Sequence, residues 1–403
     1  MSAIEYEIIR KRRTGAMQVV SSSDFSLKRV KVVAAQDVFD NPNVSLYCLD
    51  EPGKQALFVE VPPEVDLLQD SFMFQAQYRH AQKVFGVSYE TLQKRSDELG
   101  DWWDDLSLIY SVGRCGSTLV ARMFGRVPDC LSLSEPDVYS QIVGLPLTEE
   151  EIVQRLRMCT RNIWRPVAGK THLAIKYRSM GVEHATLMFR AFPDAHYLFM
   201  YRHAETYVVS AMRAFAYPWS PLWAFSWMYR LPIAKQLLRW YFARNYDEQI
   251  RFASFASKFT PRELVDLGPV GVLTITWASA MQQCLAMKQA RIPVLTLRYE
   301  DIVACPTDVV AHLMQFCNVR PENIPSTLEA MSEDAQRDSI LARDKRRKWQ
   351  LSDKHRDIIR SVLERHDVIR SADYQLPGAY RVFPRLHGSE AKAAEVAQRR
   401  SVG

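Results

Sequence analysis

Apolar and polar positions follow two different patterns along the chain, with the change near residue 105. Before it, short apolar stretches of strand length are separated by turn residues, and they cover residues 6–9, 28–34, 45–49 and 57–61. Helical periodicity follows over residues 64–85 and again over 89–99. Residues 1–104 are therefore expected to form a β-rich leader, and no motif of recognisable chemistry stands out in it.

After residue 105, longer apolar runs alternate with helical periodicity. Strands are predicted at residues 106–112, 173–177, 196–201 and 294–299, and helices from 117, over 180–192, 204–215 and 277–290. Buried apolar strands that alternate with helices indicate an α/β domain with a mostly parallel sheet covered on both faces. We expect this domain to span residues 105–385, followed by a frayed polar tail at 386–403.

Composition narrows the class of protein. The chain has 403 residues, 47% of them apolar and 24% charged, which is typical of a globular protein. The net charge of +6 favours anionic ligands mildly, and it is too small to predict a nucleic-acid partner. Seven widely spaced cysteines without a CxxC pair indicate reduced thiols in a cytoplasmic protein and no metal site. Neither a signal peptide nor a membrane anchor is expected, because no suitably long apolar stretch occurs.

The segment between the first strand and helix of the α/β domain has the composition of an anion-binding loop. Gly113 and Gly116 allow a sharp turn and close approach of a ligand to the backbone. Ser117 and Thr118 supply hydroxyl and N–H groups at a helix N-terminus, and Arg114 adds a forked cation. An ordinary strand-to-helix turn would also explain the glycines and serine, so the loop alone leaves both interpretations open.

The residue after Gly116 separates two classes of phosphate-binding loop. Nucleoside-triphosphate loops carry a lysine between the second glycine and the Ser or Thr, and this chain has Ser117 directly after Gly116. This argues against a kinase or ATPase. The run Arg114-Cys115-Gly116-Ser117-Thr118 resembles the loop of sulfotransferases that depend on 3′-phosphoadenosine 5′-phosphosulfate (PAPS). The resemblance implies a P-loop-like fold in which these five residues bind the 5′-phosphosulfate, and no metal.

Further motifs extend the resemblance to residues 106–349, with a gap over residues 215–231 and with the leader uncovered. In that family an arginine at a strand end and a serine eight residues later bind the 3′-phosphate, and Arg202 and Ser210 have this spacing. The segment Arg298-Tyr299-Glu300-Asp301 resembles another family motif, which we take as support for the fold. The alternative interpretation is that Arg202 is a surface residue and Ser210 an ordinary helical residue.

A basic cluster follows at the place where the family has a loop that closes over the cofactor. It comprises Arg343, Lys345, Arg346, Arg347 and Lys348. The resemblance implies cofactor contacts from Ser339, Arg343 and Lys345. A solvated run of charges is an equally good interpretation.

Sulfuryl transfer requires a base for the acceptor's proton and cations for the charge that develops on oxygen. Glu135 is the predicted base, because a glutamate has a similar place in the tyrosylprotein branch of the family, and Asp137 is its alternative. Lys176 is expected to contact the sulfuryl group or the substrate, and Arg114 is the further catalytic cation. His172 resembles the base of the cytosolic small-molecule branch, but it precedes its strand and should lie at the wrong edge of the sheet.

Residues 215–231 contain seven aromatic side chains. Such a segment could line a hydrophobic acceptor site, contact a membrane surface peripherally, or pack against the leader. We therefore expect PAPS-dependent transfer to a hydroxyl or amine of a small or lipid-like acceptor. A phosphotransferase and a non-catalytic nucleotide-binding relative are the alternatives.

Overall fold

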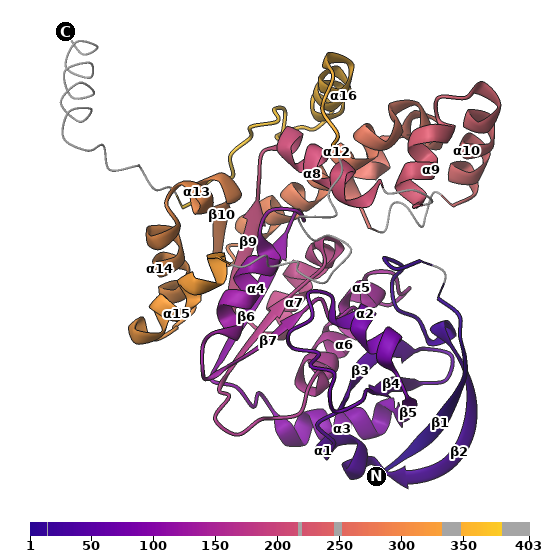
Figure 1. Cartoon of the computed structure of the whole chain (residues 1–403), viewed down its shortest axis with the longest axis vertical. Coiled ribbons are helices and arrows are strands. Elements are labelled where there is room, and N and C mark those ends of the chain that lie inside the picture. Colours follow the sequence, from indigo (N-terminus) through magenta and orange to yellow (C-terminus); the bar gives the residue numbers. More distant parts are fainter. Residues whose placement is uncertain (14, 217–219, 246–251, 333–347, 381–403) are drawn as a thin grey trace.

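The computed structural model describes residues 1–13, 15–216, 220–245, 252–332 and 348–380. Two five-stranded sheets organise them, an antiparallel sheet in the leader and a parallel sheet in the following domain (Figure 1). The α/β class with an N-terminal β-rich extension is thus confirmed.

The leader sheet has the strand order β2-β1-β5-β4-β3 and is antiparallel throughout. Its strands are β1 (Ser2–Lys11), β2 (Phe25–Ala34), β3 (Val44–Asp50), β4 (Gln55–Glu60) and β5 (Lys83–Ser88), with helices α1 (Ala35–Asp40), α2 (Met73–His80) and α3 (Tyr89–Leu99). The prediction of one helix over residues 64–85 is wrong at both ends. The helix is confined to α2, because Val84, Phe85 and Val87 are buried in a strand that pairs with both β1 and β4.

The second sheet is parallel, with the order β10-β9-β6-β8-β7. Its strands are β6 (Asp105–Ser111), β7 (Cys130–Ser134), β8 (His172–Lys176), β9 (His196–Tyr201) and β10 (Val294–Arg298). β7 was not predicted from the sequence. The surrounding helices include α4 (Ser117–Gly125), α5 (Val138–Val143), α6 (Glu149–Asn162), α7 (Ala185–Ala191) and α8 (Ala204–Phe215). Along the sheet, the chain runs in one direction from β6 to β7 and in the other direction from β7 through β8 and β9 to β10. Because crossovers between parallel strands are right-handed, the connections of the two directions lie on opposite faces of the sheet, so helices cover both faces.

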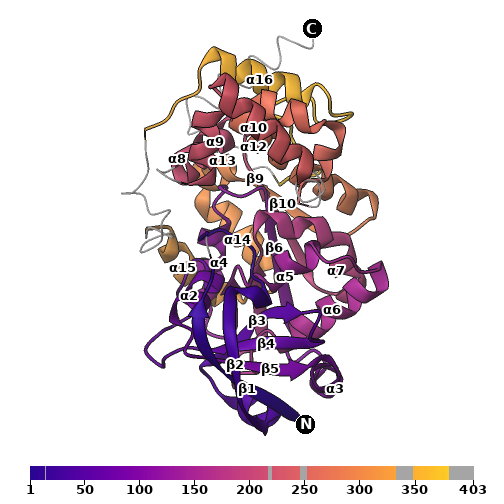
Figure 2. The same ribbon diagram turned by 90° about the vertical axis from the view of Figure 1, so that its right-hand side faces the viewer.

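Further helices complete the domain. They are α9 (Pro221–Met228), α10 (Pro232–Arg244), α12 (Pro261–Gln289), α13 (Tyr299–Ala304), α14 (Pro306–Phe316), α15 (Ile324–Glu329) and α16 (Asp353–Leu363). Helices α9, α10 and α16 pack on α12 at the end of the molecule opposite the leader (Figures 1 and 2). Within the described ranges, α12 is the one helix long and apolar enough to cross a membrane. Because 72% of its apolar window is buried, it has the character of a core helix.

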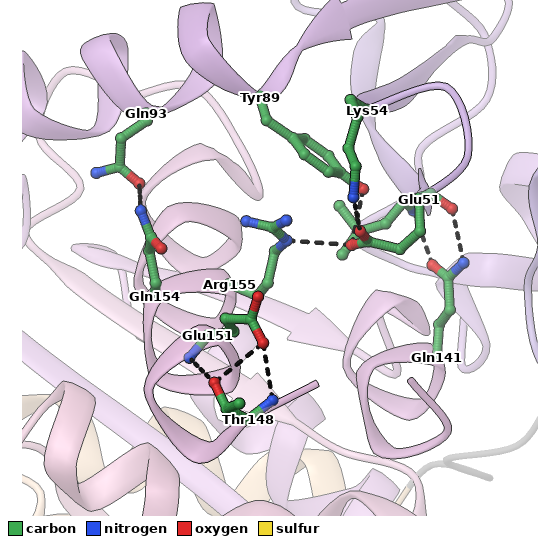
Figure 3. Close-up of polar contacts among 10 residues, drawn as sticks. Glu51, Lys54, Tyr89, Gln93, Gln141, Thr148, Glu151, Gln154 and Arg155 are labelled. Atoms are coloured by element: carbon green, nitrogen blue, oxygen red, sulfur yellow. Dashed lines mark hydrogen bonds and ion pairs between the residues drawn. The ribbon is translucent and has the colours of Figure 1, made fainter. Parts of the chain in front are cut away.

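Polar contacts join the leader to α5 and α6 (Figure 3). Arg155 Nε lies 3.1 Å from a carboxylate oxygen of Glu51, and the Tyr89 hydroxyl donates to the same carboxylate at 2.9 Å. Gln141 makes two hydrogen bonds of 2.7 Å with the backbone of Leu49. The leader is therefore attached to the α/β domain by specific side chains as well as by apolar packing.

Candidate functional site

The loop between β6 and α4 has a backbone that favours glycine at two of its positions. Gly113 and Gly116 have φ values of 82° and 85°, and Arg114 between them has 55°. A Cβ on residue 116 would come within 3.1 Å of the Tyr299 ring. Gly116 is also the N-cap of α4, so this helix has no N-cap side chain that accepts a hydrogen bond from its first turn. No N-cap side chain therefore competes with an anionic ligand for the N–H groups of this turn.

Three residues proposed for the cofactor come together beside this loop. Arg114 Nε donates to Ser210 Oγ at 3.3 Å, although the two residues are far apart in sequence. Arg202 follows the last residue of β9, and its Nη1 donates to the Arg114 carbonyl at 2.8 Å. Arg202 Nε donates to Thr206 Oγ1 at 2.9 Å. The two guanidinium groups and the serine hydroxyl thus form one cationic surface at the carboxyl edge of the sheet.

Tyr299, which we took for part of a fold motif, belongs to this surface. The Arg202 guanidinium lies 4.7 Å from the centre of the Tyr299 ring, and the same ring faces Gly116. Trp277 Nε1 donates to the Arg202 carbonyl at 3.0 Å. The sequence signal was the Arg-Tyr-Glu-Asp segment itself, at the end of β10.

Cys115 lies between the cations of the site. Its thiol is fully buried and its Sγ is 3.3 Å from the Met200 carbonyl oxygen. Burial raises the pKa of this thiol, and the charges of Arg202 and Lys176 act in the opposite direction. A protonated Cys115 supports the loop by packing, with its backbone at the anion site.

Glu135 and Lys176 form a buried ion pair at the ends of β7 and β8. Lys176 Nζ donates to Glu135 Oε1, and the backbone N–H of Glu135 donates to the Lys176 carbonyl at 2.7 Å. Among the described residues, Glu135 Oε2 is buried without a hydrogen-bond partner. Glu135 also has a φ of 59°, which turns the chain away from β7 at this point. One carboxylate oxygen is therefore held by a cation while the other remains available.

A second ion pair follows two residues later on both segments. Asp137 accepts two hydrogen bonds from Arg178 Nη1, at 2.8 and 2.9 Å, and one of 3.0 Å from the Val20 N–H. Arg178 Nη2 donates to the Met17 carbonyl at 2.6 Å. Because its carboxylate is committed to these partners, Asp137 is a poorer candidate for the base than Glu135.

The leader contributes a side chain to the neighbourhood of the first pair. The Phe72 ring centre lies 6.0 Å from Lys176 Nζ, and the Ser134 hydroxyl donates to the Ser71 carbonyl at 2.8 Å. Sequence reasoning gave no function to the leader, and no local pattern at Phe72 could have indicated this contact.

His172 lies at the opposite edge of the sheet from the loop. It is the first residue of β8, buried, and its Nε2 is 2.9 Å from Ser107 Oγ. Burial lowers the pKa of His172 to about 4. His172 is therefore distant from the carboxyl edge of the sheet, and its ring is buried and hydrogen-bonded to Ser107.

Ser339, Arg343 and Lys345 lie outside the described residues, as do residues 217–219 of the aromatic segment. In the ranges that are described, no group of three or more His, Cys, Asp or Glu side chains is placed to hold a metal ion.

No protein-family model matches the chain, and no curated protein matches it. Several solved structures are similar to it, among them three sulfotransferases. The sulfotransferase domain from the curacin biosynthetic pathway is 18% identical, with a TM-score of 0.35 over 73% of this chain and 97% of the other. A sulfotransferase from Alicyclobacillus acidocaldarius is 15% identical, with a TM-score of 0.30 over 56% and 94%. Sulfotransferase STF1 from Mycobacterium tuberculosis is 12% identical, with a TM-score of 0.32 over 60% and 76%. Because these TM-scores are low, the functional inference rests on the residues of this chain.

Proposed function

We propose that this protein is a sulfotransferase that moves the sulfuryl group of PAPS to a hydroxyl or amine of a small or lipid-like acceptor. One observation carries the proposal. The uncapped N-terminus of α4 lies beside a cationic surface formed by Arg114, Arg202 and Ser210. A donor with anionic groups at both its 5′ and 3′ positions requires two such adjacent sites.

The residues fit this donor in number and in chemistry. The backbone of residues 114–118 and the hydroxyls of Ser117 and Thr118 would hold the 5′-phosphosulfate at the start of α4. Arg202 and Ser210 would hold the 3′-phosphate, for which a guanidinium offers paired donors. When bound, PAPS supplies the sulfuryl group that is transferred.

The chain's own part in the transfer is to position the acceptor, move its proton and offset charge. Glu135 Oε2 takes the proton of the acceptor's hydroxyl, while Oε1 remains paired with Lys176. The Lys176 ammonium offsets negative charge on the sulfuryl oxygens, as Arg114 does from the loop. All seven cysteines are free thiols, which supports a cytoplasmic enzyme.

Two other functions make different predictions about ligands. A phosphotransferase would bind ATP, although Gly116 is followed by a serine and the loop lacks the lysine that such enzymes use. A non-catalytic relative would bind the PAPS product, 3′-phosphoadenosine 5′-phosphate, and transfer nothing. The buried pair of Glu135 and Lys176 favours a catalyst, because two desolvated charges are costly to keep without a use.

Ligand-induced thermal stabilisation distinguishes these functions. The bisphosphate should raise the melting temperature, since a ligand at about 100 times its Kd stabilises the folded state by about 2.7 kcal/mol, and ATP should raise it far less. Arg202→Ala should abolish most of the shift, whereas Arg190→Ala, an exposed arginine on α7, should leave it unchanged. A shift with ATP and none with the bisphosphate contradicts the proposal. Screening acceptors with labelled PAPS then separates an enzyme from a binding protein.

A further inference from the structure

Helix α10 has two apolar faces, and only one of them is buried. Leu238 and Phe242 are buried on the side toward α12. The opposite side presents Ile233, Leu237, Trp240 and Tyr241, with Ile233 84% and Trp240 64% exposed. These four positions follow helical spacing, so they form one continuous stripe. Folding of the chain alone does not explain why such an apolar stripe is exposed to water.

The stripe continues onto the end of α9. Trp227, 58% exposed, lies in the last turn of α9, and Leu231 lies in the connection from α9 to α10. We define the α9–α10 surface as Trp227, Leu231, Ile233, Leu237, Trp240 and Tyr241. Thirteen large apolar side chains are exposed among the described residues, and six of them lie within this short stretch. Exposed apolar side chains are therefore concentrated on the α9–α10 surface, and such a concentration indicates a contact surface.

The charged side chains that α9, α10 and their connection carry are all basic, and Asp266 of α12 pairs with two of them. Residues 220–245 contain Arg230, Lys235, Arg239 and Arg244 and no acidic residue. Lys235 and Arg239 are 2.7 Å from Asp266 on α12, whereas Arg230 and Arg244 lie over the rings of Tyr229 and Trp240. Arg230 and Arg244 thus flank the apolar stripe near its two ends.

We propose that the α9–α10 surface docks on an anionic lipid surface. Exposed tryptophan and tyrosine beside aliphatic side chains suit the boundary between headgroups and acyl chains, and flanking arginines attract anionic headgroups. A second copy is a less suitable occupant, because a twofold contact through this face brings the arginines of both copies together. The surface lies at the end of the molecule remote from the leader sheet, so the leader does not obstruct a flat membrane (Figures 1 and 2).

Vesicle sedimentation of the full chain tests this directly. We expect the protein to pellet with vesicles of phosphatidylcholine and phosphatidylglycerol in equal parts, to bind pure phosphatidylcholine much less, and to lose binding as salt rises. Leu237→Asp should lower the partition coefficient by at least about tenfold, because burying one leucine is worth more than one decade of affinity. Val303→Asp on α13 is the matched control, since Val303 is 57% exposed and Leu237 is 59% exposed. It should bind like the wild type.

Several results would overturn the proposal. These are wild-type protein that stays in the supernatant with anionic vesicles, equal binding to neutral and anionic vesicles, and equal loss in both variants. A wild-type dimer in light scattering that Leu237→Asp dissociates would instead identify the face as an interface between copies. Circular dichroism melting of both variants confirms that a loss of binding does not reflect unfolding. None of these outcomes depends on sulfuryl transfer, so this proposal and the proposed function fail separately.

Discussion

The Glu135–Lys176 pair can be neutralised at either end or at both ends, and the three variants separate stability from catalysis. The two side chains are 8% and 4% exposed, respectively. Removing one partner of such a buried pair leaves the other charge uncompensated, which costs about 3–5 kcal/mol. For a chain of 403 residues, at about 2.1 cal/mol/K of unfolding entropy per residue, this lowers the melting temperature by about 4–6 °C. We expect this fall in Glu135→Gln and in Lys176→Met.

The double variant, Glu135→Gln with Lys176→Met, should regain most of the lost stability. Both charges are then absent, and a neutral pair of similar volume replaces an ion pair at little or no cost. Activity should behave differently, because loss of a general base lowers the rate by about 10²–10⁴-fold whether or not the fold is stable. The measurements are scanning calorimetry and transfer of label from PAPS to an acceptor found by screening.

An exposed ion pair on the same domain is the matched control. Arg190 and Glu149 are 2.7 Å apart with side chains 44% and 69% exposed, so Glu149→Gln should change stability very little. Single variants at the buried pair that melt like the wild type would refute the energetic reasoning. Glu135→Gln that binds the bisphosphate normally and transfers at the wild-type rate would refute the assignment of the base.

Three further variants test the surroundings of the site. Asp137→Asn should cost about 3–5 kcal/mol in denaturant unfolding, because Arg178 loses its buried partner; an unchanged midpoint would contradict this. Gly116→Ala should fold, at a cost of about 1–2 kcal/mol from its positive φ, and should weaken bisphosphate binding in calorimetry, because its Cβ forces the Tyr299 ring away. His172 has its pKa lowered from 6.5 to about 4 by burial, so the unfolded chain takes up its proton first as pH falls. The contribution of neutral His172 to the free energy of unfolding is therefore fully present above pH 6.5. It is lost progressively toward pH 4, by up to about 3 kcal/mol. His172→Gln should flatten this part of the stability profile.

The fold could be predicted where the apolar pattern is continuous, and it was missed where the pattern is weak. β6, β8, β9 and β10 are buried parallel strands and therefore appear as apolar runs. β7 is an edge strand in which Ser132 interrupts the apolar residues, so nothing distinguished it from the loop after α4. β5 contains Gly86 and follows a helical pattern, and only pairing with β1 and β4 makes it a strand.

The grouping of the cationic residues could be predicted from topology alone. Arg114 and Arg202 follow neighbouring parallel strands, whose carboxyl ends meet at one edge of the sheet. Tyr299 and Phe72 could not be assigned in this way. Tyr299 faces Gly116 from the first residue of α13, directly after β10, which lies two strands from β6, and Phe72 approaches Lys176 from the leader. Both contacts therefore depend on tertiary packing. Their roles, like those of the residues outside the described ranges, remain predictions.

The two ion pairs at the ends of β7 and β8 explain why the leader is needed by the proposed catalytic residues. Glu135 and Asp137 lie two residues apart, as do Lys176 and Arg178, so fixing the second pair also restricts the first. The second pair is held by backbone groups of the leader, and Ser71 and Phe72 of the leader approach the first. Without residues 1–104 these charges would face water, and their geometry would no longer be fixed. The leader therefore contributes one side of the proposed site.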